Sequence, residues 1–494
     1  MTGQADARLY EAFFEESSLP YCDIDAARAF LADAAAASPF AQRALIEQQI
    51  LPLFRPGTPQ TGQPDILGRV ATLAREGGLA ECFAAHDARI LAGPLRPFVE
   101  AVNRPDPDGC RRVLFVATTP YFVILREAMY LRRNGHKVFL LSLSPLPQNL
   151  SAMFAAHFDG LADTRNSFRL MRAVLAALRP DVVHVQCWMW MYVLGRLAIE
   201  SCPDAAVVCE FYDATSLFAA PADMAIKWDR RLIDFDITLE AFILRHADAV
   251  VSRYSPAVAA AWAERQGARP RYLEFQPYPC PEFGHPGAPR EDGPIRLVYA
   301  GSFLPPDKDH PPSLFPEVSM PGVFRSLLDQ GFAVDIYHPP QVDPAKLGPQ
   351  FEPYRRLERE CDRFRLLPGI APDRFAEAIS GYDYGIHLFD FDPRVLRLDP
   401  LWMQGVMPTR FFSYLEAGLP GIVIAEYGDM TRLLEDHGMG LGLPAKDIPR
   451  LAEVLGRTDR DALAANVRRY NEAHGMDKEI FRLIGLYDEI IRNR

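Results

Sequence analysis

The sequence lacks the features that mark a secreted or membrane-spanning protein. No stretch approaches the roughly 20 consecutive apolar residues that a spanning helix needs. The first residues, MTGQADARLYEAFFEE, carry acidic side chains where a secretion signal needs basic ones, and they lack its apolar run. We therefore expect a cytoplasmic protein whose contact with membranes is at most peripheral.

Basic residues are also in the minority. The 494 residues include 53 Lys and Arg against 64 Asp and Glu, which gives a formal net charge of -11. Such a balance argues against nucleic acid as a partner. A local basic patch of Lys227, Arg230 and Arg231 could meet a phosphate or an anionic lipid, although a solvated surface is the commoner meaning of such a patch.

The eight cysteines include no Cys-x-x-Cys pair. Scattered cysteines in a chain of this length are typical of reduced, mostly buried thiols, and they argue against a disulfide framework or a zinc site. The length and the 49% hydrophobic content are enough for about three domain-sized units with buried cores.

What the sequence does contain, from residue 112 onward, is an alternation of short apolar runs with helical segments. The runs are rich in β-branched residues and apolar on both faces, as buried parallel strands are. The Pro- and Gly-rich stretch 277–294 divides them into two sets, since it can continue neither helix nor strand. The pattern predicts two Rossmann-like domains. The expected strands are 112–117, 137–142, 181–186, 206–211, 248–252, 296–301, 333–338, 363–369, 384–389, 421–425 and 440–443.

The first hundred residues have a different pattern. Their apolar positions recur three and four apart, which predicts helices, and the linker 52–64 divides them. Three roles stay open for this region: docking of an acceptor, assembly into a homo-oligomer, or cover for the first sheet. We expect that neither half-sheet requires it.

The stretch 407–425, MPTRFFSYLEAGLPGIVIA, is the most informative of the chain. Pro408 and Thr409 suit the first turn and the cap of a helix, and Gly418 suits its end. A helix that follows the carboxyl end of a parallel strand directs its free amides at the crevice where such sheets bind phosphates. Arg410 lies in the first turn of this helix, which favours an anionic, phosphorylated ligand.

This stretch resembles the nucleotide-sugar site of the family 4 type of GT-B glycosyltransferase, a segment of the form P-N-K-L-F-E-Y-M-A-A-G-L-P-V-I. Similarity continues in REAMYLRRNGHKVFLLS, PDVVHVQ, HADAVVSRYSP and RLVYAGSF, from Arg112 to the carboxyl terminus. The resemblance implies an α/β protein of GT-B architecture, in which two Rossmann-like domains face a cleft. The implied parts are a helical region (1–105), an acceptor-side domain (106–280), a nucleotide-sugar-binding domain (281–476) and a helix that crosses back to the first half (477–494).

The resemblance implies a glycosyltransferase that moves a sugar from a nucleotide diphosphate sugar to a glycan, a lipid-linked acceptor or a protein, with retention of configuration. It implies neither a cofactor nor a metal. Two alternatives stay open: a nucleotide-sugar epimerase of the same architecture, and a catalytically degenerate scaffold. The scaffold interpretation rests on departures from the family pattern: Ser413 stands where the family has a ribose-binding Glu, Ser302 where it has an Arg, and Tyr121-Phe122-Val123 where it has a Gly-Gly loop.

Sugar transfer needs positive charge or amide dipoles on the leaving diphosphate, and contacts on the ribose. Glu416, one helical turn beyond Ser413, is the nearest carboxylate that could replace the family's Glu. Lys308 could replace the family's loop lysine, although a solvated lysine is the commoner meaning of its loop. The predicted donor-binding residues are Gly301, Lys308, Thr409, Arg410, Ser413 and Glu416.

Transfer also needs a group that handles the proton of the acceptor hydroxyl. His184, Glu210 and Asp213 lie at or just after the ends of predicted strands, which face the cleft in this architecture, and they are the predicted catalytic residues. Asp213 could instead cap the loop that follows it.

Two further groups of residues allow two interpretations each. The acidic loop 389–400 resembles a metal site, but helix caps and pairing with arginines explain its carboxylates as well, and we expect no metal. The aromatic runs 188–192 and 382–384 could stack on a sugar, although packing is their commoner role. The acidic loop contains Asp390, Asp392 and Asp399 beside Arg394 and Arg397.

Overall fold

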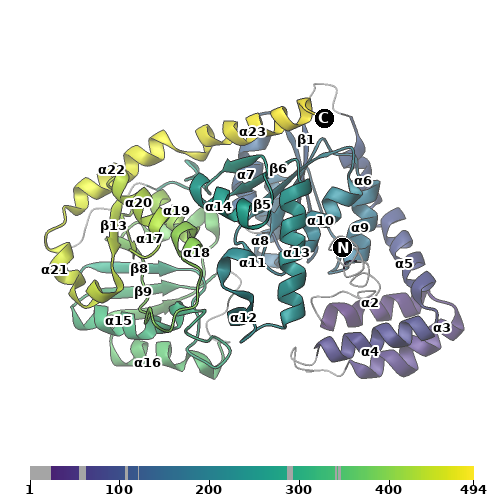
Figure 1. Cartoon of the computed structure of the whole chain (residues 1–494), viewed down its shortest axis with the longest axis horizontal. Helices are drawn as coiled ribbons and strands as arrows, with labels where there is room; N and C mark the ends of the chain where they lie inside the picture. Colours follow the sequence, from purple (N-terminus) through teal and green to yellow (C-terminus); the bar gives the residue numbers. More distant parts are fainter. Residues whose placement is uncertain are drawn as a thin grey trace.

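The computed structural model describes residues 24–54, 63–105, 110–120, 122–285, 293–339 and 347–494, together with Tyr10 and Val342. It contains two parallel sheets, each flanked by helices, and they lie side by side along the long axis of the molecule (Figure 1). None of the described helices combines the length and the apolar composition needed to cross a bilayer. The seven cysteines in these ranges are free, and four of them are buried.

The first domain carries a seven-stranded sheet in the order β3-β2-β1-β4-β5-β6-β7. Its strands are β1 (Arg112–Ala117), β2 (Lys137–Ser142), β3 (Gly160–Asp163), β4 (Val182–Cys187), β5 (Ala206–Phe211), β6 (Ala249–Ser252) and β7 (Tyr272–Glu274). Its helices are α7 (Phe122–Arg133), α8 (Gln148–His157), α9 (Phe168–Ala177), α10 (Val193–Ser201), α11 (Thr215–Phe218), α12 (Pro221–Met224), α13 (Arg230–His246) and α14 (Pro256–Arg265).

The second domain carries a six-stranded sheet in the order β10-β9-β8-β11-β12-β13. Its strands are β8 (Arg296–Ala300), β9 (Ala333–Tyr337), β10 (Phe364–Leu367), β11 (Tyr384–His387), β12 (Gly421–Ile424) and β13 (Gly440–Leu443). Its helices are α15 (Met320–Asp329), α16 (Glu352–Glu360), α17 (Pro372–Ile379), α18 (Pro400–Gly405), α19 (Arg410–Glu416), α20 (Gly428–Asp436), α21 (Leu451–Leu455) and α22 (Arg460–Ala473).

All eleven predicted strands are present, and their ends differ from the expected ones by at most two residues. The sequence analysis missed β3 and β7. Both are short strands at the two edges of the first sheet, and their residues are only partly buried. They therefore lack the all-apolar run by which a strand covered on both faces can be recognised.

The last helix, α23 (Met476–Arg492), runs back from the second domain over the first (Figure 1). Its buried side chains share a hydrophobic cluster with α7 and with one face of the first sheet. Side chains alternate between the two faces of a strand. Val182 and Val208 therefore lie on the face that α7 and α23 cover, and Val183 and Val207 on the opposite face.

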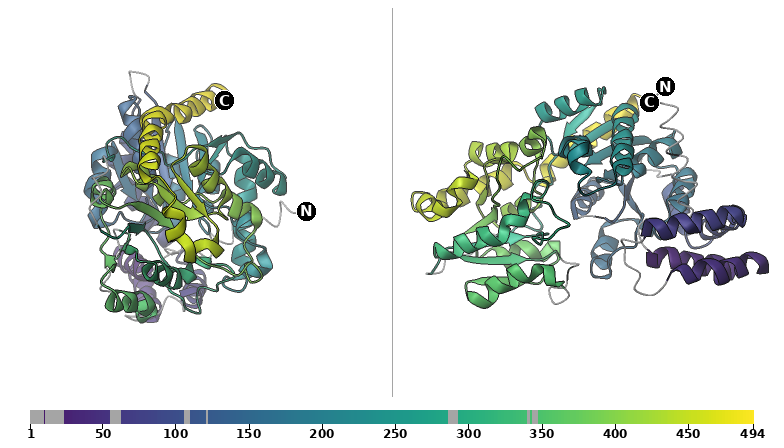
Figure 2. Two further views of the ribbon diagram at one scale, coloured as in Figure 1. Left: turned by 90° about the vertical axis from the view of Figure 1, so that its left-hand side faces the viewer. Right: turned by 60° about the horizontal axis from the view of Figure 1, so that its bottom comes forward.

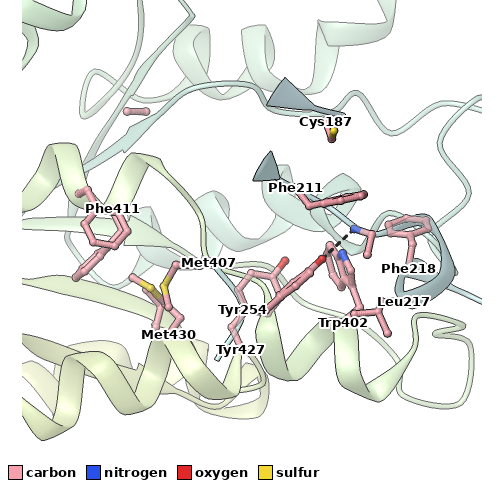
Figure 3. Packing of buried hydrophobic residues seen from close by; sticks show 14 of the residues in the cluster. Cys187, Phe211, Leu217, Phe218, Tyr254, Trp402, Met407, Phe411, Tyr427 and Met430 are labelled. Carbon is pink, nitrogen blue, oxygen red and sulfur yellow. Dashed lines mark hydrogen bonds between the residues drawn. The ribbon is translucent and has the colours of Figure 1, made fainter. Parts of the chain in front are cut away.

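The two domains share one continuous core. The ring of Trp402, in α18 of the second domain, lies 5.4 Å from that of Phe218, in α11 of the first (Figure 3). Ala219 and Leu398 form an antiparallel bridge beside them. The segment that follows β11 thus reaches across to the first domain and holds the carboxyl edges of the two sheets together.

The N-terminal helices divide into two groups. The first three share a hydrophobic cluster with the start of α5, which includes Leu31, Ile46, Val70 and Phe83, and they lie beside the first domain (Figure 2, right). The last two reach the main core, where the ring of Phe98 lies 6.2 Å from that of Phe139 in β2. The helices are α2 (Ile24–Ala37), α3 (Phe40–Leu45), α4 (Gln63–Glu76), α5 (Ala80–Ala92) and α6 (Arg96–Asn103).

The expectation that neither half-sheet requires the first hundred residues is therefore wrong for α5 and α6. Phe98 of α6 packs on β2 of the first sheet, and Ile90 of α5 joins the same core, so this part of the core would otherwise meet water. Part of the region predicted to be helical, residues 1–23, lies outside the described residues, apart from Tyr10.

Two truncations test this division. A chain that begins at residue 79 should fold, whereas one that begins at residue 106 should be insoluble, because it loses four further side chains of the main core. Burial of each is worth roughly 1.5–3 kcal/mol, and their sum of about 6–12 kcal/mol rivals the whole stability of a domain. Soluble yield and thermal unfolding are the measurements, and a folded chain from residue 106 would refute the assignment. The four residues are Ile90, Leu95, Phe98 and Val102.

Candidate active site

Arg410 lies where the carboxyl ends of β8 and β11 meet, in the first turn of α19. Its guanidinium carbon lies 4.5 Å from the ring centroid of Tyr299, and its Nη1 lies 3.4 Å from Nδ1 of His387. Burial, reinforced by the charge of Arg410, lowers the pKa of His387 well below its usual value, so the imidazole is neutral and its Nδ1 can accept from the guanidinium. The aromatic face adds a cation–π attraction. A positive charge is thus fixed at the carboxyl edge of the second sheet.

Gly301 follows β8 and lies against this guanidinium. Its φ of +107° belongs to a region that favours glycine, and a Cβ at this position would lie 3.6 Å from the guanidinium carbon of Arg410. The structure therefore brings together Gly301, Thr409 and Arg410 of the predicted donor residues. Thr409 does not cap the helix as expected, because its backbone (φ -60°, ψ -29°) is already helical, whereas a capping side chain needs an extended backbone.

Asp213 approaches this position from the first domain. It follows β5, its backbone carbonyl accepts a hydrogen bond from the Tyr192 hydroxyl, and its side chain is half-buried. Burial raises the pKa of the Asp213 carboxyl, and the charge of Arg253 opposes this shift. An acid with a raised pKa suits a group that takes up a proton near neutral pH.

Glu317, which the sequence analysis missed, contacts Tyr427, whose ring lies 5.5 Å from that of His387. Burial raises the pKa of its carboxyl; the charge of Arg410 lowers that pKa and the charge of Asp213 raises it, so Glu317 lies within electrostatic reach of both. The hydroxyl of Tyr427 also lies 3.4 Å from its Oε1 and donates to it. Glu317 belongs to a short 3-10 turn (Pro316–Ser319) with no motif that could have identified it from the sequence.

His184 and Glu210 do not face the cleft, so that expectation is wrong. Both lie inside strands and point to the face that α7 and α23 cover, with exposed fractions of 0% and 2%. The structure places Nε2 of His184 3.5 Å from Oε2 of Glu210, and the Tyr487 hydroxyl of α23 lies 2.5 Å from the other ring nitrogen, Nδ1. The two residues come together, but in the interior of the first domain.

Glu416 forms a buried ion pair between the domains. Its Oε2 lies 2.6 Å from Nη2 of Arg126 in α7, both side chains are 1% exposed, and its Oε1 accepts from the backbone N–H of Cys280 at 2.8 Å. A carboxylate engaged at both oxygens inside the domain junction is not placed to meet a ribose. Ser413, on the same helix, is half-buried.

The remaining charged candidates are dispersed. Lys308 is exposed on its loop. Oδ1 of Asp399 accepts from the N–H of Leu401 and so caps α18, while its Oδ2 lies 2.6 Å from Nη1 of Arg265. Asp392 pairs with the neighbouring Arg394 at 2.7 Å. These contacts match the capping and pairing interpretation of the acidic loop.

The basic patch is engaged in local contacts. Nζ of Lys227 donates to the backbone carbonyl of Asp309 at 2.6 Å, across the two domains. Arg230 pairs with Asp234, and Arg231 pairs with Asp229, each at 2.8 Å. These contacts fit a solvated surface.

The aromatic run after β4 lines the first domain beside Asp213. The ring of Trp188 stacks on that of Tyr212 at 4.5 Å, and Trp190 packs 4.8 Å from Trp228. Trp190 has a φ of +71°, which is a strained value for a tryptophan. Its backbone N–H donates to Oδ2 of Asp236 at 3.0 Å, and this hydrogen bond stabilises the strained conformation. Stacking of this run on a sugar stays a prediction.

Comparison with known proteins shows a family resemblance for part of the chain. Residues 77–279 match the family model of a glycosyl transferase 4-like domain, a range that takes in α5 and α6 and begins well before Arg112. A search of curated protein sequences finds no match.

Among solved structures, Alr3699/HepE of Anabaena in complex with UDP-glucose is 12% identical, with a TM-score of 0.50 over 77% of this chain and 98% of that chain. An O-GlcNAc transferase mutant of Thermobaculum terrenum is 14% identical, with a TM-score of 0.49 over 99% of this chain and 98% of that chain. The predicted GT-B fold and the resemblance to the family 4 type are confirmed.

Proposed function

Since the chain has the GT-B fold and residues 77–279 form a glycosyl transferase 4-like domain, we propose that it transfers a sugar from a nucleotide diphosphate sugar to an acceptor in the cytoplasm. The observation that carries this proposal is the Arg410 guanidinium fixed against Gly301 at the carboxyl edge of the second sheet. The UDP-glucose in the Anabaena structure supports a nucleotide diphosphate sugar as the donor. Glycans, lipid-linked molecules and proteins are all candidate acceptors.

Each step of the transfer has a residue within the site. The bond between the anomeric carbon and the diphosphate breaks, and Arg410 offsets the charge that develops on the leaving oxygen. The acceptor oxygen bonds to the anomeric carbon, and its proton passes to Asp213 of the first domain, which follows Tyr212, a residue that Arg253 joins to Met407 of the second domain. The family resemblance supports retention of configuration at that carbon.

A catalytically degenerate scaffold is the second candidate. Ser413 offers a short hydroxyl where the family has a ribose-binding carboxylate. Glu416 does not replace that carboxylate, because it forms an ion pair with Arg126. Ionised carboxylates accept stronger hydrogen bonds than a serine hydroxyl does, so ribose recognition is weaker or comes from elsewhere. A scaffold of this kind would bind a nucleotide without turnover, and an epimerase would turn over a nucleotide sugar without releasing the nucleotide.

Binding of a nucleoside diphosphate tests the location of the site. We expect it to raise the melting midpoint, because a ligand that binds the native state stabilises it. Hydrogen exchange should slow within residues 295–475, around β8 and α19. Protection confined to residues 110–275 would contradict the placement of the donor on the second domain.

A further inference from the structure

A closed cluster of ionisable side chains lies inside the first domain, separate from the proposed donor site. It consists of Glu127 in α7, His184 in β4 and Glu210 in β5, which are 0%, 0% and 2% exposed. One oxygen or nitrogen atom from each residue lies within 4.8 Å of the others. The proposed transfer reaction uses none of these three residues.

The cluster contains buried polar atoms that the described part of the chain does not satisfy. In the part of the chain that the structure describes, both carboxylate oxygens of Glu127 and Nε2 of His184 have no hydrogen-bond partner. Across the same ranges, neither Glu127 nor Glu210 forms an ion pair with a lysine or an arginine. Burying a carboxylate without a partner is costly, and two adjacent carboxylates repel each other. A cation between the two carboxylates would offset both negative charges, and the unpaired oxygen and nitrogen atoms would become its ligands.

The surrounding residues direct the free atoms inward. The Tyr487 hydroxyl contacts Nδ1 of His184 at 2.5 Å, which leaves Nε2 to face the two carboxylates. An outer hydrogen bond of this kind orients the imidazole in most histidine-ligated metal sites. Gln186 donates from Nε2 to the Tyr212 hydroxyl at 2.6 Å, and that hydroxyl donates to Glu210 at 3.2 Å. The side-chain oxygen of Gln186 has no hydrogen-bond partner among the described residues.

We propose that Glu127, His184 and Glu210 bind one divalent cation of the first transition row, with Zn²⁺ as the representative. Two ligand atoms of a tetrahedral Zn²⁺ are about 3.4 Å apart when each lies about 2.1 Å from the metal. The separation between Nε2 of His184 and Oε2 of Glu210 is 3.5 Å. The imidazole favours such a metal over Mg²⁺ or Ca²⁺. Two positive charges balance the two carboxylates.

The ion has a structural role in this account. It fastens α7 to β4 and β5, and through Tyr487 it holds α23, the helix that returns from the second domain. Arg126, next to Glu127, pairs with Glu416 of the second domain. Metal binding therefore fixes the helix that carries the buried pair between the domains. No ligand spacing in the sequence marks this site, because its three residues lie on separate elements.

Metal analysis of the purified full-length chain is the first test. We expect about one equivalent of a first-row metal per chain, its loss on dialysis against a chelator, and a lower melting midpoint for the metal-free protein. Adding back Zn²⁺ should restore the midpoint. A chain that holds no metal as purified, and whose midpoint moves with neither Zn²⁺ nor Mn²⁺, would overturn the proposal.

A matched pair of variants locates the site. Glu127→Gln should lose the bound metal and the Zn²⁺-dependent rise in melting midpoint. Glu240→Gln is the control, because Glu240 is equally buried but accepts hydrogen bonds from the N–H of Ser216 (3.1 Å) and from Nε1 of Trp262 (2.7 Å). It should keep both properties. Unchanged metal content in Glu127→Gln would refute the assignment, and if that variant does not fold, the metal content of the unmodified chain decides.

Discussion

Replacing Arg410 by alanine is expected to weaken binding of a nucleoside diphosphate by about 1.5–3 kcal/mol, the range for a hydrogen bond to a charged group. This corresponds to roughly a 10- to 150-fold rise in Kd. Binding of the bare nucleoside should change little, because the guanidinium lies beside Gly301 and is assigned to the diphosphate alone. Isothermal titration calorimetry with both ligands measures the difference.

The control for this prediction is Arg394→Ala. Arg394 belongs to the exposed loop that follows β11 and pairs only with its neighbour Asp392 among the described residues. Its removal should leave both affinities unchanged. If Arg410→Ala weakened the nucleoside and the diphosphate equally, Arg410 would instead act on the fold through Tyr299 and His387.

Replacing Arg126 by alanine should lower the free energy of unfolding by about 3–5 kcal/mol, the cost of leaving one partner of a buried ion pair alone. Glu416 would keep only the N–H of Cys280 as a partner. The loss should reach both domains, because the pair joins α7 to α19. Urea unfolding, followed separately for each domain by hydrogen exchange, measures it.

Two comparisons sharpen this second prediction. Arg96→Ala, which removes an exposed pair with Glu100, should leave the free energy of unfolding nearly unchanged. The double variant Arg126→Met, Glu416→Leu should recover much of the loss, since apolar residues of similar size can replace a buried pair. An unchanged unfolding free energy in Arg126→Ala would refute the role of the pair.

Glu416→Gln should lower the free energy of unfolding and should change the affinities for ribonucleotides and deoxyribonucleotides equally. A larger loss of affinity for the ribonucleotide would instead assign Glu416 to ribose binding.

Most of the parallel strands could be predicted from the sequence because they are buried on both faces and mainly apolar. The two missed strands, β3 and β7, lie at the edges of the first sheet and are only partly covered. Arg410 and Gly301 could also be predicted, since both follow from position along the chain: one opens the helix after a strand, and the other ends a strand.

Side-chain direction could not be predicted in the same way. His184 and Glu210 lie inside their strands, on the face of the sheet that α7 and α23 cover. The sequence does not indicate which face those helices cover. Glu416 has the right spacing on its helix, yet its direction depends on Arg126, a residue of the other domain. Glu317 reaches the site through a turn whose sequence carries no motif. These outcomes depend on contacts between elements far apart in the chain.

The most direct test of the central claim is release of free nucleoside diphosphate from a panel of UDP-, GDP- and ADP-sugars incubated with the full-length chain. The account predicts that at least one donor yields its nucleoside diphosphate, slowly by hydrolysis and faster with an acceptor, and that Arg410→Ala loses most of this activity while remaining folded. If the protein binds nucleoside diphosphates but releases none from any donor, the proposed transferase activity is contradicted. The chain would then be a catalytically inactive scaffold with a glycosyltransferase fold.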